Sequence, residues 1–167
     1  MSKFPYYVPE GNLRLNVAIL ILVLEIHGET IRKKPLLNNE RLLIIIYLVK
    51  NPLVMNKILW RFGLSIVSLE DQDFYSVAGL SVNLDPLFDL DSLKDLLRHV
   101  AALGIVVVKY KKDQGFLYFL NRDGHALVQS LSGDYLGKIR IYLEALLPIK
   151  SISTSALSSA ISSILNE

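Results

Sequence analysis

Two long apolar runs, residues 17–24 and 42–49, restrict the fold of this chain more than any other feature. Each run is eight residues long and is bounded by polar or charged side chains. A membrane-spanning helix needs about 20 consecutive apolar residues, so neither run is long enough to span a bilayer. The first run lies in a segment, residues 13–27, that is too long for one strand and is apolar on nearly all sides. This pattern predicts a central, buried helix.

The chain as a whole is unusually apolar for its length of 167 residues. Hydrophobic residues make up 51%, and the mean hydropathy is +0.38, although a small soluble chain must expose much of its surface. Residues 1–5 also lack the cationic and apolar pattern of a signal peptide. We therefore expect a cytoplasmic protein, and two explanations of its hydrophobicity stay open. Either the core is very densely packed, or part of the surface is covered by partner proteins.

Charge and cysteine content exclude several classes of site. The net charge is only +2, which is too small to indicate a dedicated nucleic-acid binder. The chain has no cysteine, so disulfides, thiolate metal sites and cysteine nucleophiles are excluded. The length suits one domain with an appendage. We expect a core at residues 1–132, with an irregular insertion at about 64–90, and a C-terminal helical extension at 133–167.

Capping residues define three helices in the first third of the chain. They are predicted at residues 13–27, 40–50 and about 52–62. Gly28 ends the first helix, either Asn38 or Asn39 caps the second, and Pro52 is well suited to the first position of the third. The following residues are less regular, although 75–82 can form a short strand.

The second half of the chain has a sharper pattern. A helix from Asp91 is predicted to bury one stripe, formed by Leu93, Leu96, Leu97, Val100 and Leu103. Residues 105–110 and 116–120 are rich in β-formers and flank a charged turn, so they predict a hairpin. Further helices are expected at 121–131, 135–147 and 151–165. The expected fold class is mainly α with a small β-hairpin (α+β).

The order of helix, glycine, strand, basic turn, strand and capped helix resembles a winged helix. Gly104 lets the chain reverse after the helix, and Asn121 stands where such proteins usually have a threonine that caps the next helix. The alternative is any helix followed by a hairpin. The fold is thus expected to be a winged-helix-like core with additional C-terminal helices.

Sequence-specific DNA reading is disfavoured. The outer face of the helix before the wing is predicted to carry Asp91, Lys94, Asp95, Arg98 and His99, and its carboxylates would repel phosphates. Two basic clusters are better candidates for contact with the DNA backbone: Arg32, Lys33 and Lys34, and Lys109, Lys111 and Lys112. Such charges at loop tips can equally serve only to keep the protein soluble.

No motif indicates catalysis, a metal or a cofactor. His27, His99 and His125 are scattered and do not have the spacing of a metal site. The acidic clusters, residues 70–73 and 85–91, lack the spacing of a calcium loop, and acidic loops are usually solvated. Residues 133–138 have the wrong glycine spacing for a phosphate-binding loop. We therefore expect a protein that is not an enzyme and needs no cofactor.

The C-terminal segment is serine-rich but carries an apolar stripe. The stripe consists of Leu157, Ala160, Ile161, Ile164 and Leu165. Serine is a mediocre helix former, so this helix must gain most of its stability by docking its apolar face. The face can dock on its own domain or in a groove of a partner protein.

Four phrases of the sequence are similar to those of a known family. They are residues 13–15, 39–43, 50–52 and 137–140. Together with the predicted wing they resemble the middle component of bacterial ABC-three-component systems, which includes the accessory subunit of Lamassu-type complexes. The resemblance implies a non-catalytic subunit that accompanies an SMC-like ABC ATPase and an effector, often a nuclease, in antiviral or anti-plasmid defence.

Two functional hypotheses follow. In the first, the chain is an accessory subunit that bridges the ATPase and the effector and touches DNA non-specifically. In the second, it is a homodimeric winged-helix transcription regulator that dimerises through residues 135–165. Excess apolar character and the acidic residues at Asp91 and Asp95 favour the first hypothesis.

Overall fold

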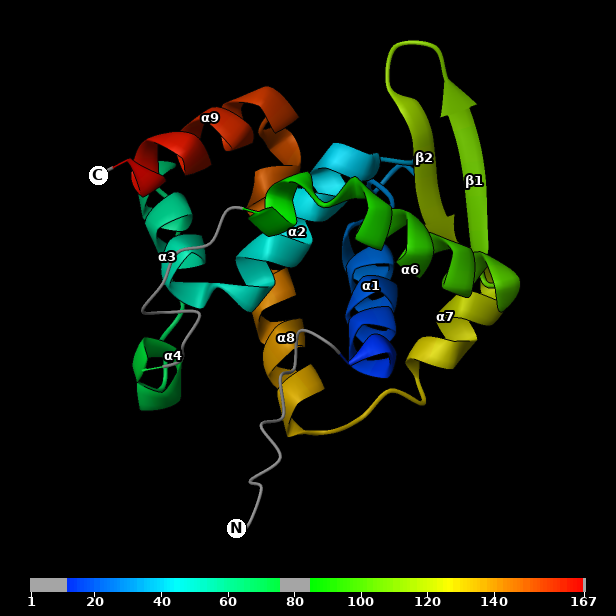
Figure 1. Ribbon diagram of the computed structural model, residues 1–167, viewed down its shortest axis with the longest axis horizontal. Coiled ribbons are helices and arrows are strands. Elements are labelled where there is room, and N and C mark those ends of the chain that lie inside the picture. Colours follow the sequence, from blue (N-terminus) through cyan, green and yellow to red (C-terminus); the bar gives the residue numbers. More distant parts are fainter. Residues whose placement is uncertain (1–11, 76–84, 167) are drawn as a thin grey trace, which may run out of the picture.

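The computed structural model describes residues 12–75 and 85–166, and they form a helical body with one protruding hairpin (Figure 1). The elements are α1 (Leu13–His27), α2 (Asn39–Lys50), α3 (Pro52–Arg61), α4 (Asp71–Tyr75), the 3-10 helix η2 (Asp85–Phe88), α6 (Leu90–Ala102), β1 (Val106–Lys111), β2 (Gly115–Leu120), α7 (Arg122–Val128), α8 (Asp134–Ala145), the 3-10 helix η3 (Leu147–Ser151) and α9 (Thr154–Leu165). The predicted fold class, mainly α with a small hairpin, is confirmed.

Helix α1 lies at the centre of the molecule, as its sequence predicts. Every side chain from Ala18 to Leu24 is buried, and the helix packs against α2, α6, α7, α8 and β2 (Figure 1). Asn12 caps its first turn, because the Asn12 side chain accepts a hydrogen bond of 3.1 Å from the Leu15 amide. A helix that is covered on all sides explains an apolar run without any polar face.

Helices α2 and α3 meet at a sharp corner. Asn38 caps α2 by accepting a 2.9 Å hydrogen bond from the Arg41 amide, and Pro52 opens α3, so both sequence signals are confirmed. In the described parts of the chain, no single helix has the length and apolar composition of a membrane span. Helices α2 and α3 have the required length and composition only when they are counted together, and a bend of 113° separates them.

The C-terminal helices pack into the same core as the rest of the chain. Helix α8 lies against α1 and α2, and α9 lies against α3 and α2. His27 at the end of α1 is linked to α8, since its Nε2 lies 2.8 Å from the carbonyl oxygen of Leu143. The expected division between residues 1–132 and 133–167 stays a prediction, and these contacts favour one cooperative unit.

The segment after α3 is more ordered than an exposed acidic loop. Lys138 of α8 forms ion pairs with Asp73, at 2.9 Å, and with Glu70, at 3.2 Å. The Tyr142 hydroxyl donates to Asp73 at 3.1 Å. Burial and the hydrogen bond to Asp73 raise the pKa of Tyr142 to about 12. The expectation of solvated carboxylates at 70–73 is therefore wrong for Asp73, whose side chain is only 12% exposed beside Lys138, whereas the Glu70 side chain stays 69% exposed although it pairs with the same lysine.

Three other expectations need correction or lie outside the description. Leu103 does not continue the buried stripe of α6, because the helix ends at Ala102 and the Leu103 side chain is 59% exposed. The helix expected to reach residue 147 ends at Ala145, and a 3-10 helix that contains Pro148 follows it. The possible strand at 75–82 begins at the last residue of α4, and the rest of it lies outside the described residues.

Candidate interaction surface

The hairpin is attached to the body by a small unit of glycines and one asparagine. Gly104 has a φ of +69°, which a residue without a side chain adopts readily. The side chain of Asn121 donates a 2.6 Å hydrogen bond to the Gly104 carbonyl and accepts one of 2.9 Å from the Gly124 amide. Asn121 thus caps α7, as predicted, and also ties the start of α7 to the end of α6.

The α6–β1–β2–α7 unit has the order of elements expected for a winged helix, and the winged-helix assignment itself stays a prediction. The outer face of α6 does carry the expected residues Asp91, Lys94, Asp95, Arg98 and His99, all of which are exposed. Arg98 pairs with Asp95 at 2.6 Å. Two carboxylates therefore stand on the surface that a DNA-reading helix would present to phosphates.

The base of the hairpin is fixed to the core, and at its turn the Asn38 side chain donates a 3.5 Å hydrogen bond to the Gln114 carbonyl. Leu117 and Leu120 are buried. The far side of β2 is held by residue Leu37, whose carbonyl accepts a 2.9 Å hydrogen bond from the Tyr118 amide. Beyond these contacts the two strands extend past the helices as an arm (Figure 1).

One face of the arm is apolar and exposed. Tyr110 stands opposite Phe116 in the strand register, and the two rings meet edge to face with centroids 5.3 Å apart. Val108 lies two residues before Tyr110, on the same face. These side chains are 47%, 66% and 53% exposed for Val108, Tyr110 and Phe116. We call these three residues the aromatic face.

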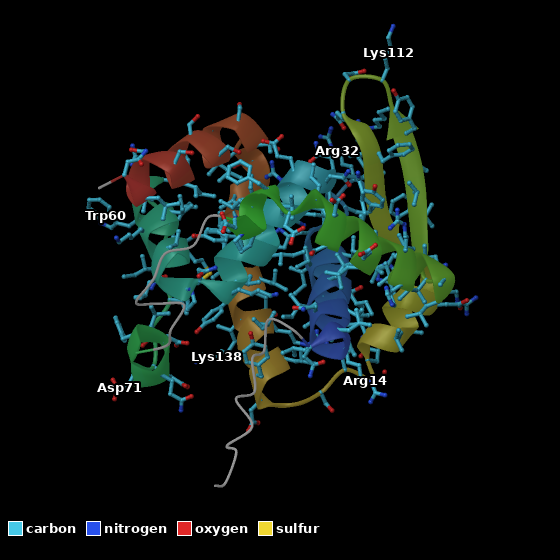
Figure 2. All side chains as sticks on the ribbon, viewed as in Figure 1. Arg14, Arg32, Trp60, Asp71, Lys112 and Lys138 are labelled. Atoms are coloured by element: carbon cyan, nitrogen blue, oxygen red, sulfur yellow. The ribbon has the colours of Figure 1, made fainter. Side chains whose placement is uncertain are left out.

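The lysines of the arm lie on its other face and at its turn. Lys109 and Lys111 alternate with Tyr110 along β1, so they point away from the aromatic face. Lys109 places its ammonium group 5.3 Å from the centre of the Phe119 ring. Lys112 belongs to the turn and marks the outermost end of the arm in Figure 2. All three lysines are exposed.

The second predicted basic cluster lies in the turn that precedes α2. The Thr30 amide donates to the Lys34 carbonyl at 2.9 Å, and Lys33 adopts a positive φ of 57° to close the turn. Arg32, Lys33 and Lys34 are exposed. In the view of Figure 2, Arg32 and Lys112 both lie toward the end of the molecule from which the arm projects, and Arg14 lies toward the other end. The fold thus brings both predicted clusters to one end.

The stripe of α9 is covered by the chain itself. Leu157, Ala160, Ile161 and Ile164 are all buried, and Leu165 is partly buried. They belong to the core cluster, where α9 packs against α3. Of the two possibilities left open by the sequence, this arrangement is docking on the chain's own domain. A partner would reach the stripe only after α9 had left α3.

The histidines lie apart from one another. His27 is buried, His99 is exposed on α6, and His125 of α7 contacts the carboxylate of Glu25 on α1. Burial, together with the nearby charges of Lys150 and Arg41, lowers the pKa of His27 to about 4. Across residues 12–75 and 85–166, no three histidine or acidic side chains are grouped as they would be around a metal ion.

The helical body thus carries an exposed arm with the aromatic face on one side and lysines on the other, a combination that is common at macromolecular interfaces. The family model of the ABC-three component (ABC-3C) system Middle Component 4 matches residues 27–159. Because this match spans well over half of the chain, the protein belongs to that family. The resemblance to middle components is confirmed. No curated protein and no solved structure matches the chain.

Family membership makes the chain an accessory component of a multi-subunit system. The aromatic face was not anticipated from the sequence. Tyr110 and Phe116 are β-formers that flank a turn, and such residues are buried as often as exposed. Their position next to the turn was the one sequence signal of exposure, since residues near the tip of a hairpin have few neighbours from the body.

Proposed function

We propose that the chain is a non-catalytic scaffold subunit that bridges an SMC-like ABC ATPase and an effector nuclease in a cytoplasmic defence complex. The observation that carries this proposal is the exposed aromatic face on a protruding arm. Three large apolar side chains, each about half exposed or more, cost hydration free energy unless a partner covers them. An accessory component of a multi-subunit system is expected to have such a surface.

Bridging is tested by reconstitution with the other two components of the same system. The ATPase and the effector should elute together in size-exclusion chromatography only when the chain is co-expressed with them. Replacement of Tyr110 and Phe116 by serine should weaken the assembly at least tenfold, since buried aromatic anchors commonly contribute 2 kcal/mol or more to an interface. Ile141→Ser is the matched control, because Ile141 is 56% exposed on α8, away from the arm.

Any of three results would contradict the proposal. One is association of the ATPase and the effector that is equally strong without the chain. Alternatively, the arm variant and the Ile141→Ser control would weaken the assembly to the same extent. A monodisperse, highly soluble monomer that binds neither component would also contradict the proposal.

Non-specific contact with the DNA backbone is the second part of the proposal. It is supported by the location of both basic clusters, residues 32–34 and 109–112, at one end of the molecule. Each phosphate contact makes the logarithm of the binding constant fall by about 0.9 for each unit of log salt concentration. Changing Lys109, Lys111 and Lys112 to glutamine should therefore flatten the salt dependence for any duplex sequence. Arg14→Gln with Lys57→Gln, both exposed and outside these clusters, should leave it unchanged.

The alternative, a homodimeric transcription regulator, makes the opposite prediction. It requires a symmetric dimer and strong discrimination between duplexes in a competition assay. The residues expected to dimerise, 135–165, bury their main apolar side chains within their own chain, which favours the scaffold over the regulator.

A further inference from the structure

The outer edge of β1 has no strand beside it among the residues that the structure describes. The sheet consists of β1 and β2, and the bridge to Leu37 is made by Tyr118 of β2. The side of β2 that faces away from β1 is therefore occupied near its middle. The corresponding side of β1 is open.

The strand register shows which backbone groups point toward this open edge. The Tyr118 amide donates to Leu37, so Tyr118 turns its backbone groups away from β1. Its register partner is Val108, and both members of such a pair in an antiparallel ladder point outward. Tyr110, two residues further along β1, points the same way. The Asn121 amide donates to the Ile105 carbonyl. This bond agrees with the register, in which the odd-numbered residues of β1 point their backbone groups toward β2.

The outward N–H and C=O groups of Val108 and Tyr110 belong to exposed residues and have no backbone partner among the described residues. Both residues are about half exposed or more, and no backbone hydrogen bond joins either of them to a described residue outside the hairpin. The side chains of both belong to the aromatic face. The same edge is flanked by Lys109 and Lys111 on the opposite face.

We propose that the open edge of β1 binds an extended, acidic segment of a partner protein, which adds to the sheet as a third strand. This inference rests on the proposed scaffold function and names the chemistry of its partner. An added strand would bond to the backbone of Val108 and Tyr110. Its alternate residues would place carboxylates beside Lys109 and Lys111 and apolar side chains beside the aromatic face.

A second copy of this chain is a poor occupant of the edge. Antiparallel pairing centred on the exposed half of β1 brings Lys109 opposite a lysine of the other copy, and like charges in that position destabilise a sheet. Lysines on an edge strand commonly prevent such self-association. Against an acidic strand the same lysines are attractive, so they select the partner.

Nucleic acid is also a poor occupant of the edge itself. The outward carbonyls of Val108 and Tyr110 need hydrogen-bond donors, and a DNA phosphate backbone supplies only acceptors. A peptide backbone supplies donors and acceptors in alternation, which matches the edge. DNA contact at the lysine-bearing turn remains compatible with a strand bound along the edge.

The first test separates the backbone of the edge from its side chain. Val108→Pro removes the outward N–H, and proline is tolerated on an edge strand at such a position. Val108→Ala keeps the N–H and shortens the side chain. In the complex reconstituted from the three components of the system, we expect Val108→Pro to weaken assembly at least tenfold and Val108→Ala to weaken it less than threefold. Equal effects of the two variants would overturn the inference.

The second test does not depend on the folding of any variant. Amide hydrogen exchange is measured for β1 in the free chain and in the reconstituted complex. The amides of Val108 and Tyr110 should exchange quickly in the free chain and slow at least tenfold in the complex. The amides of Val107 and Lys109, which face β2, should be protected in both states.

The outcomes distinguish this inference from the proposed function. A complex that forms without protecting Val108 and Tyr110 overturns the inference and leaves the scaffold function intact. Failure to form any complex overturns both. Protection that arises in the free chain with duplex DNA alone, or on concentrating the free chain, identifies nucleic acid or a second copy as the occupant and also overturns the inference.

Discussion

A buried arginine joins two distant parts of the chain. Arg41 of α2 is only 4% exposed, and its guanidinium donates to the carbonyls of Ile149 and Ile152, at 2.6 Å and 2.9 Å. These bonds fasten the segment between α8 and α9 to the core. The Ile149 carbonyl also accepts a 2.9 Å hydrogen bond from the Ile152 amide, so Arg41 adds a second donor to a carbonyl of η3. Burial of a charged group is acceptable here because several acceptors surround it.

His27 makes folding sensitive to acid. Its pKa is about 4 in the folded chain and 6.5 when solvated, so the unfolded chain binds a proton more readily. Stability is therefore fully present above pH 6.5 and is lost as the pH falls toward 4. The total contribution is up to roughly 3 kcal/mol, since one pKa unit corresponds to about 1.4 kcal/mol.

This effect is measured by urea unfolding between pH 7 and pH 4. The difference in unfolding free energy between wild type and His27→Gln should shrink or reverse as the pH falls, because glutamine cannot be protonated there. His99→Gln, at an exposed site on α6, is the control and should track the wild type. Parallel curves for all three proteins would show that His27 does not titrate as described.

At the scale of elements, the contact between the hairpin base and α7 depends on a helical glycine. A Cβ at Gly124 would lie 2.6 Å from the Ile105 carbonyl oxygen and 3.0 Å from the Leu120 side chain. A Cβ at Gly137, in α8, would meet nothing within 4 Å. The packing around Gly124 therefore requires a glycine, whereas the space around Gly137 would accommodate a side chain.

Substitution by alanine should separate the two. Gly124→Ala should lower the free energy of unfolding by about 1–3 kcal/mol, because the backbone or Leu120 must move. Gly137→Ala should raise it by about 0.5–1 kcal/mol, because alanine favours a helix. Thermal or urea unfolding of both variants measures this, and a stabilising Gly124→Ala would contradict the close packing of α7 on the hairpin base.

Docking of α9 on its own domain leads to another prediction at this scale. Ile161 is 1% exposed in the isolated chain, so Ile161→Ala should cost about 2–5 kcal/mol of stability without any partner present. Its neighbour Ser162 is exposed, and Ser162→Ala should be neutral or slightly stabilising. If Ile161→Ala left the isolated chain unchanged in urea unfolding, α9 would be free to dock elsewhere.

At the scale of the whole molecule, the first and last helices share one core. Helix α8 covers α1, and α9 covers α3, so residues 133–167 complete the burial of the central apolar run. We expect a chain shortened to residues 1–132 to lose cooperative unfolding and to aggregate, because α1 would expose part of its surface.

Far-ultraviolet and near-ultraviolet circular dichroism, both measured during urea unfolding, provide the check. In the full chain both signals should change in one coincident transition, whereas the shortened chain should show a broad, shallow one. A shortened chain that unfolds sharply at a similar urea concentration would instead establish residues 1–132 as an independent domain.

Much of the local structure follows from the sequence, and the reasons are local. Asn38 and Asn121 cap helices, Pro52 opens one, and Gly104 reverses the chain. Each acts on backbone groups within a few residues of itself, so its effect is readable without knowledge of the fold. The partners of Lys138 were not readable, because Glu70 and Asp73 lie far away in sequence.

The candidate surface was predictable only in part. The lysines and arginine of the two basic clusters were identified as exposed because charged side chains are rarely buried. Their position at one end of the molecule depends on the bridge between Leu37 and Tyr118, which joins segments far apart in the chain. The exposure of Tyr110 and the burial of Ile161 likewise depend on which elements pack beside them.

The sequence by itself thus determined the long helices, the hairpin and the apolar centre, since these depend on periodicity, capping and local composition, and its short phrases carried the family resemblance. The tertiary structure decided which apolar surfaces stay open. It covered the stripe of α9 with α3, and it left the aromatic face and the edge of β1 exposed. Burial is a property of packing between distant segments, and the same apolar pattern serves a core or an interface equally well.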